Sequence, residues 1–309
     1  MEIVFAANAG ASDGSGHFKR CIEYAASLDR TKYSSLIFGK CEFQWLKDFA
    51  INKQVRTSTN HRFTKDSILI IDSYSRTFIE EVFQKAGSRN AIQIADPFTP
   101  LLPSSKIIWF DPGEPPEYLS GRVVASGTKY FPIQKVKSAR IQPEVAKHVL
   151  ISVGGTQQSK ILNNLIAAIE LNLFMGTVFH VIGNNEFGSK LQNNFEFHPF
   201  GSYISNLLDL CDTAISATGI SAWDFLANGL LLGYFKFVEN QGSNFSFLNQ
   251  KGFGMPLSSD GMHFPESSIK ALIQDTGWRT KMNPSAIELF DFDWRLKFNN
   301  LIDIFSGSK

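Results

Sequence analysis

Residues 2–28 have the sequence EIVFAANAGASDGSGHFKRCIEYAASL, in which three patterns follow one another. The apolar run at residues 2–7 has the length and composition of a buried strand. Glycines and small polar residues come next. Beyond them the apolar residues recur at helical spacing and share one helix face (Phe18, Cys21, Ile22 and Ala25). The stretch therefore predicts a strand, a glycine-rich turn and a helix, which is the repeating unit of an α/β fold.

The same order recurs along the rest of the chain. Further strands are predicted at residues 34–39, 67–72, 91–96, 106–110, 122–126, 148–155, 176–183, 195–200, 212–217 and 230–237. Helices are predicted at residues 42–50, 76–86, 159–172, 203–211, 222–229, 244–252 and 293–305. Strands that alternate with helices favour parallel sheets covered on both faces. The polar, proline-containing segment 132–147 interrupts the pattern. We therefore expect an α/β protein of two facing Rossmann-like domains, residues 1–145 and 146–309, with ligands bound in the cleft between them at the carboxyl ends of the strands.

The composition excludes several classes of protein. The 309 residues carry a net charge of +1, so no overall positive field attracts nucleic acid or an anionic membrane. The three cysteines (Cys21, Cys41 and Cys211) have no metal-binding spacing and fit a reducing compartment. We find neither a signal peptide nor an apolar stretch of about 20 residues. These observations lead us to expect a cytoplasmic protein.

The glycine-rich turn contains the first candidate catalytic residue. Gly14 and Gly16 allow the backbone to turn sharply and to approach a ligand closely. His17 at the start of the helix can serve as an acid or base near neutral pH. The alternative is a turn whose histidine caps the helix. The dinucleotide-binding pattern GxGxxG is excluded because Lys19 stands at the third glycine position, so a nicotinamide enzyme is disfavoured.

A second group of candidates follows the predicted strand 67–72. Asp72 and Tyr74, in the segment IDSY, would emerge at the carboxyl edge of the sheet, near His17 if the two strands are neighbours. The alternative is an ordinary turn, since Asp and Ser commonly end strands.

Three turns in the second half could hold a phosphate or a sugar. SVGGT provides Gly154, Gly155 and Thr156 after a strand, and VENQ provides Glu239 and Gln241. The segment SATGISAWDF places Thr218, Gly219 and Ser221 before a helix, whose first N–H groups suit a pyrophosphate. The alternatives are a Thr or Ser helix cap for the middle turn and a solvent-facing loop for VENQ.

The remaining histidines show no metal-binding pattern. We interpret them as structural or surface residues and expect no metal site (His61, His148, His180, His198 and His263).

The ordered set GSGHFKRC, IDSY, SVGGT, SATGISAWDF and VENQ, within residues 1–255, resembles the UDP-sugar hydrolases of pseudaminic acid biosynthesis. That family is related to spore-coat polysaccharide proteins and, more distantly, to the N-acetylglucosaminyltransferase of peptidoglycan assembly. The resemblance implies a GT-B fold, sugar bound mainly by the first domain, UDP bound mainly by the second, and no metal or other cofactor. It implies that His17 activates water at the anomeric carbon and that Tyr74 lines the sugar side. Asn240 and Gln241 match the family's NQ motif.

The sequence also departs from that family. Ala6 and Asn8 stand where the hydrolases usually have Arg and Asp, and Asp224 stands where they usually have Glu. The segment ADPF carries only Asp96 of the usual aspartate pair. These departures leave the sugar and the acceptor open.

The leading hypothesis is a nucleotide-sugar enzyme of bacterial surface-polysaccharide biosynthesis that cleaves the anomeric C–O bond with inversion. His17 would deprotonate water, and N–H groups near Gly219, Gly155 and Thr156 would stabilise the leaving UDP. The alternative is an inverting glycosyltransferase that uses a glycan hydroxyl, which leaves open a peripheral association with membrane-bound glycan machinery. A non-catalytic nucleotide-sugar binder is a second alternative, against which His17 argues. No nucleic-acid partner is expected.

Overall fold

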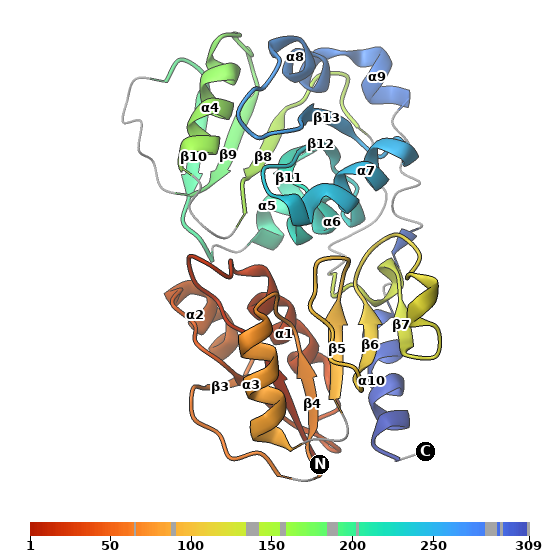
Figure 1. Ribbon diagram of the computed structural model, residues 1–309. Coiled ribbons are helices and arrows are strands. Elements are labelled where there is room, and N and C mark those ends of the chain that lie inside the picture. The colour runs from red at the N-terminus through yellow and green to blue at the C-terminus, as the bar shows by residue number, and fades with distance from the viewer. Residues whose placement is uncertain are drawn as a thin grey trace. The chain divides into compact units, whose positions relative to one another are not determined.

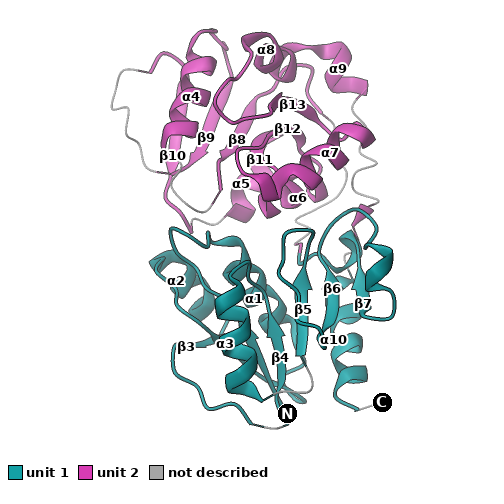
Figure 2. Cartoon of the chain, viewed as in Figure 1, with its two compact units in different colours: residues 1–132, 291–309 teal, residues 133–290 magenta. Residues whose placement is uncertain are grey.

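The computed structural model describes residues 1–64, 66–87, 91–133, 142–154, 159–183, 191–201, 204–281, 289–290 and 293–307. The chain divides into two compact units (Figures 1 and 2). Unit 1 contains Met1–Pro132 and Asp291–Lys309, and unit 2 contains Ile133–Phe290.

Unit 1 is built on a seven-stranded sheet with the order β3-β2-β1-β4-β5-β6-β7. All of its strand pairs are parallel. The strands are β1 (Glu2–Ala6), β2 (Ser34–Phe38), β3 (Arg56–Ser58), β4 (Ile68–Ile71), β5 (Ala91–Ala95), β6 (Lys106–Trp109) and β7 (Val123–Ser126). The chain order reverses between β1 and β4. In parallel α/β sheets, ligands bind outside the carboxyl ends of the strands at such a reversal.

The strands of unit 1 are apolar on both sides because helices cover both faces of the sheet. Ile3 and Phe5 of β1 pack in one cluster with α1 (Gly16–Ser27), α2 (Gln44–Asn52) and α10 (Trp294–Phe305). Val4 and Ala6 point to the other face, in a cluster with α3 (Arg76–Ala86). Two short 3-10 helices, η1 (Glu117–Leu119) and η2 (Thr128–Tyr130), flank β7. The doubly covered sheet explains why the strand sequences read as continuous apolar runs.

Unit 2 repeats this plan with a six-stranded parallel sheet of order β10-β9-β8-β11-β12-β13. Its strands are β8 (His148–Ser152), β9 (Val178–Ile182), β10 (Asn194–His198), β11 (Thr213–Ala217), β12 (Leu231–Phe235) and β13 (Met255–Ser258). Its helices are α4 (Ser159–Glu170), α5 (Ile204–Leu210), α6 (Ile220–Ala227), η3 (Glu239–Gln241), α7 (Gly242–Lys251), α8 (Glu266–Gln274) and α9 (Thr276–Lys281). Here the chain order reverses between β8 and β11. The expected α/β architecture of two Rossmann-like parallel sheets is confirmed.

The unit boundaries differ from the expected division at residues 145 and 146. The first segment of unit 1 ends at Pro132 and its second segment begins at Asp291, so the C-terminal helix belongs to the same unit as the N-terminal half (Figure 2). The physical reason is apolar packing. Trp294 and Phe298 of α10 are fully buried, and their rings lie 5.7 and 4.4 Å from that of Tyr24 on α1. Residues 134–141 of the predicted connection 132–147 lie outside the described residues.

No helix in the described parts of the chain combines the length and the apolar character needed to cross a bilayer.

Candidate active site

His17 is positioned by the turn between β1 and α1. Gly14 has a φ of +73°, a conformation that favours glycine. Its backbone exchanges two hydrogen bonds with Gly10, of 2.9 and 3.2 Å. The helix begins at Gly16, where an added Cβ atom would meet nothing within 4 Å. The turn thus closes a tight loop directly before α1 and fixes His17 in the first helical turn.

The ring of His17 is bound to Asp72, which directly follows β4. His17 Nδ1 lies 2.6 Å from Asp72 Oδ1, and both side chains are buried. A carboxylate at this distance requires a proton on Nδ1, so the neutral ring carries its lone pair on Nε2. Nε2 forms no hydrogen bond with any residue that the structure describes. The pair therefore has the geometry of a carboxylate that orients a histidine base.

Arg20, one helical turn after His17, completes the group. Its Nε donates to Asp72 Oδ2 and its Nη2 donates to Asp72 Oδ1, both at 2.6 Å. The guanidinium stacks on Phe110, 3.8 Å from the ring centroid. Arg20 Nη2 also lies 3.2 Å from His17 Nδ1, but two protonated nitrogens cannot share a hydrogen bond. Arg20 therefore holds Asp72, and Asp72 holds His17.

The charges of this group are matched despite their burial. Burial alone would raise the pKa of Asp72, but the charge of Arg20 and the hydrogen bonds from Arg20 and His17 hold it below its ordinary value. Burial opposes the charged form of Arg20, yet Asp72 raises the pKa of Arg20 above its ordinary value. Asp72 is consequently ionised at neutral pH and can stabilise a positive charge that develops on His17.

Tyr74 lies against the same histidine. Its ring meets that of His17 edge to face, with centroids 4.4 Å apart. The hydroxyl of Tyr74 donates to the carboxylate of Asp96, which follows β5. Burial raises the pKa of Tyr74 well above its ordinary value and Asp96 adds to the effect, so the phenol remains neutral. Tyr74 therefore forms a wall beside His17 and is itself fixed by Asp96.

The expected neighbourhood of His17, Asp72 and Tyr74 is thus present at the carboxyl edge of the unit 1 sheet. The ring of His17 binds a carboxylate, so the helix-capping alternative does not describe it. The carboxyl group of Asp72 likewise binds the side chains of His17 and Arg20 instead of closing its own turn. Sequence analysis missed Arg20 as a partner, although its position three residues after His17 places both on one helix face.

In unit 2, the turn between β11 and α6 lies beside the turn that follows β12. Thr218 is fully buried, and its Oγ1 donates to the backbone oxygen of Gln241 at 3.2 Å. Asn244 Nδ2 donates to the backbone oxygen of Thr218 at 3.0 Å. These two bonds connect adjacent turns at the carboxyl edge of the sheet.

The start of α6 has no side-chain cap. Gly219 occupies the capping position, and the hydroxyl of Thr218 is used elsewhere, so the alternative of a Thr or Ser cap does not describe this helix start. The first N–H groups of the helix, those of Ile220 and Ser221, have no intrahelical acceptor. This is the arrangement in which a helix start binds an anion.

Residues Glu239–Gln241 of the VENQ segment form η3. Gln241 Oε1 accepts from the backbone N–H of Phe237 at 3.0 Å, whereas Glu239 is exposed. The side-chain oxygen of Asn240 is buried and has no hydrogen-bond partner among the described residues. A buried acceptor of this kind is costly unless a ligand or water binds it.

The glycines of SVGGT are described only in part. Gly154 follows β8 with a φ of +104°, at the same edge of the sheet as the two turns above. Gly155 and Thr156 lie outside the described residues.

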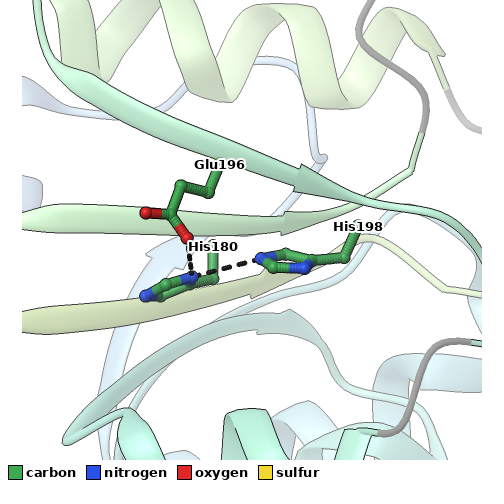
Figure 3. A group of neighbouring side chains, drawn as sticks. All are labelled: His180, Glu196 and His198. Atoms are coloured by element: carbon green, nitrogen blue, oxygen red, sulfur yellow. Dashed lines mark hydrogen bonds and ion pairs between the residues drawn. The ribbon is translucent and has the colours of Figure 1, made fainter.

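Sequence analysis assigned no metal ligands, but the structure brings together one group of potential ligands among the described residues. His180 on β9 lies beside Glu196 and His198 on β10 (Figure 3). Burial lowers the pKa of His180, while Glu196 opposes this effect. The three residues come from two strands, so no single sequence motif contains them.

Comparisons with known proteins place the fold. No model of a known protein family matches the sequence. No curated protein matches it either. The structure is similar to the S. aureus MnaA–UDP co-structure, with a TM-score of 0.68 and 8% identity. The match covers 99% of this chain and 97% of that chain. The structure is also similar to CalG4, the calicheamicin glycosyltransferase, with a TM-score of 0.62 and 12% identity. This match covers 99% of this chain and 98% of that chain. The chain has the GT-B fold.

A protein from Listeria monocytogenes described as a UDP-N-acetylglucosamine 2-epimerase also matches, with a TM-score of 0.68 and 7% identity. The match covers 100% of this chain and 97% of that chain. At such identities the likeness shows the fold alone, and function depends on the residues of the site.

Proposed function

We propose that this protein is an inverting glycosyltransferase that takes a sugar from a nucleotide sugar and passes it to a hydroxyl group. The observation that carries the proposal is the 2.6 Å contact between His17 Nδ1 and Asp72 Oδ1. Because Nδ1 is bound to Asp72, Nε2 of His17 remains available as a base. His17 lies at the carboxyl edge of the sheet, next to the point where the strand order reverses between β1 and β4.

In the proposed reaction, His17 Nε2 takes the proton of the attacking hydroxyl as its oxygen bonds to the anomeric carbon. The bond from that carbon to the diphosphate oxygen breaks, and the diphosphate leaves with the electron pair. Asp72 stabilises the imidazolium. General-base help of this kind is worth about 10²–10⁴-fold in rate. Attack from the face opposite the leaving group inverts the anomeric centre.

Unit 2 provides the groups that we assign to the nucleotide. The N–H groups of Ile220 and Ser221 suit the diphosphate. The unpaired oxygen of Asn240 suits a donor group of the nucleoside. We propose UDP as the nucleotide because one of the similar structures is a complex with UDP and another is described as acting on a UDP-sugar.

Hydrolysis is the second candidate, and the motif resemblance favours it. Water is the smallest nucleophile that His17 could activate, and sequence analysis put it first. We now put transfer first because several similar structures are named as glycosyltransferases, among them SnogD from Streptomyces nogalater and the spinosyn rhamnosyltransferase SpnG. Epimerisation is a further outcome that the same assay detects.

The test measures UDP release from UDP-sugars with and without hydroxyl acceptors, followed by analysis of the sugar product. We expect acceptor-dependent release and a glycoside of inverted configuration. Release of free sugar without acceptor would establish hydrolysis instead, and an isomerised sugar would establish epimerisation. Failure of the native protein to bind UDP in calorimetry would overturn the proposal as a whole.

The variant His17→Ala tests the base. We expect turnover to fall at least 100-fold while UDP affinity is unchanged, because the nucleotide groups are in unit 2. His61→Ala is the matched control, since His61 also pairs with a carboxylate in unit 1, at 3.1 Å from Glu2. Full turnover by the His17 variant would remove His17 from the mechanism.

A further inference from the structure

Three histidines form a diagonal row across the sheet of unit 2. They lie on the neighbouring strands β8, β9 and β10, one to each strand (His148, His180 and His198). His148 Nδ1 is 3.0 Å from His180 Nε2, and His180 Nδ1 is 3.1 Å from His198 Nε2. In such a row each neutral ring can donate its one N–H to the lone pair of the next, because an imidazole carries one donor and one acceptor nitrogen. None of the three histidines is among the residues to which we assign the binding of the sugar or the nucleotide.

The register of the strands adds a carboxylate to the row. Glu196 is the direct cross-strand partner of His180, and His198 follows two residues later on the same face of β10. Glu196 Oε2 lies 3.3 Å from His180 Nδ1. As Figure 3 shows, Glu196 and His198 both point toward the same nitrogen of His180. The ligand-type atoms of these three residues all lie within 4.8 Å of one another.

These separations match the spacing of ligands around one small cation. Two ligand atoms bound at about 2.0–2.1 Å in a tetrahedral shell lie about 3.3–3.4 Å apart. The distances from His180 Nδ1 to His198 Nε2 and to Glu196 Oε2 are 3.1 and 3.3 Å. Only small side-chain movements would therefore be needed to bind an ion between the three atoms.

His148 provides the support that a metal-binding histidine usually has. With His180 Nδ1 on an ion, the ring must carry its proton on Nε2, and that proton is directed at His148 Nδ1. The side chain of His180 is 2% exposed, whereas that of Glu196 is 60% exposed. The site is therefore anchored in the sheet and open to ions from solvent.

We propose that His180, Glu196 and His198 bind a divalent transition-metal ion, with Zn²⁺ as the best match. Two imidazoles and one carboxylate are the donors that Zn²⁺ prefers, and Mg²⁺ or Ca²⁺ would require more oxygen ligands. Three protein ligands leave a fourth position for water. The ion would connect the edge strand β10 to β9, and His148 acts as a positioning residue for His180.

The test uses the tag-free full chain after chelator treatment, titrated with Co²⁺ and followed by its visible absorption, with Zn²⁺ added as competitor. We expect one Co²⁺ per chain, displacement by Zn²⁺, and a higher unfolding temperature with either ion. His198→Ala and Glu196→Gln change partly exposed side chains, so these variants should fold. Both should bind at least tenfold more weakly, and His148→Ala about 10–100-fold more weakly.

The matched control is His263→Ala, which removes another histidine–carboxylate pair of unit 2, between His263 and Asp260 at 3.0 Å. It should bind Co²⁺ as the native protein does. Absence of stoichiometric binding by the native chain would overturn the proposal, as would full binding by both His198→Ala and Glu196→Gln.

Discussion

Among the side chains of the unit 1 site, Asp72 is the one on which the others depend most. Both of its oxygens accept from Arg20, and Oδ1 also binds His17. A buried charge that loses its partner is strongly destabilising, because the desolvation cost remains and the attraction disappears. The pair of Arg20 and Asp72 therefore couples the stability of unit 1 to the geometry of the proposed base.

We expect Asp72→Asn to lower the free energy of unfolding by about 3–5 kcal/mol, since Arg20 would remain charged and buried. Urea denaturation at neutral pH measures this loss. Glu80→Gln is the control, because it removes a carboxylate from the exposed pair of Arg76 and Glu80 and should cost at most about 1 kcal/mol. Equal losses in the two variants would contradict the role given to Asp72.

The same residue predicts a dependence on pH. The pKa of Asp72 is lower in the folded protein than its ordinary value of 3.8. Its contribution to stability is therefore complete above that value and is lost as the pH falls through the folded-state pKa. The difference in stability between the native protein and Asp72→Asn should be constant from pH 5 to 7 and should shrink below about pH 4.

The sequence could predict the residues of this site that follow adjacent parallel strands. His17 comes after β1 and Asp72 after β4, and strand ends meet at one edge of the sheet. The role of Arg20 could not be predicted in the same way. Its partner lies 52 residues away, and an arginine on an amphipathic helix is usually a solvated surface residue.

At the scale of elements, the bond between Thr218 and Gln241 joins the two turns to which we assign the nucleotide. Thr218→Val keeps the shape of the side chain and leaves the oxygen of Gln241 without its donor. We expect a loss of about 1–3 kcal/mol in stability. We also expect UDP affinity to fall on the order of tenfold, which is about 1.4 kcal/mol, measured by calorimetry.

Thr177→Val is the matched control for this prediction. Thr177 is also buried, and its hydroxyl donates to the backbone oxygen of Ala146 at 2.8 Å. It precedes β9, at the amino edge of the same sheet. We expect a similar loss of stability with unchanged UDP affinity. If UDP affinity fell equally in both variants, the loss would reflect lower stability and not the bond between Thr218 and Gln241.

The predicted elements agree with the structure where the apolar period was long. The helix expected at residues 76–86 has these same bounds in α3. The strands β3 and β13 and the helices α8 and α9 were missed. β3 has only three residues, all at least partly exposed at the sheet edge, so it carries no apolar run. β13 contains Pro256, which argues against a strand except at an edge such as this one.

At the scale of the whole molecule, the return of the chain to unit 1 could not be predicted from local patterns. The helix 293–305 was predicted, but its partner was not, since an amphipathic helix could cover either sheet. Specific contacts decide the matter. Asn299 Nδ2 donates to the backbone oxygen of Ser27 at 2.8 Å, and Tyr33 donates to Asp303 at 2.5 Å.

Phe298→Ala tests this packing. Removal of the fully buried ring should lower the free energy of unfolding by about 3–5 kcal/mol. Hydrogen exchange read by mass spectrometry should show faster exchange in β1 and α1, with unit 2 unchanged. Leu296 of the same helix is 63% exposed, so Leu296→Ala should change stability by no more than about 0.5 kcal/mol. Faster exchange confined to unit 2 would contradict the assignment of α10.

The place of α10 also governs the order in which a newly made chain can fold. Domains generally fold as they leave the ribosome, beginning with the N-terminal one. Here the first segment of unit 1 is translated before unit 2, whereas Trp294 and Phe298, which belong to its hydrophobic core, are translated after unit 2. Unit 2 is complete earlier, because its whole sequence lies between the two segments of unit 1. The unit that carries His17 is thus begun before unit 2 and can complete its core only after unit 2 has been made.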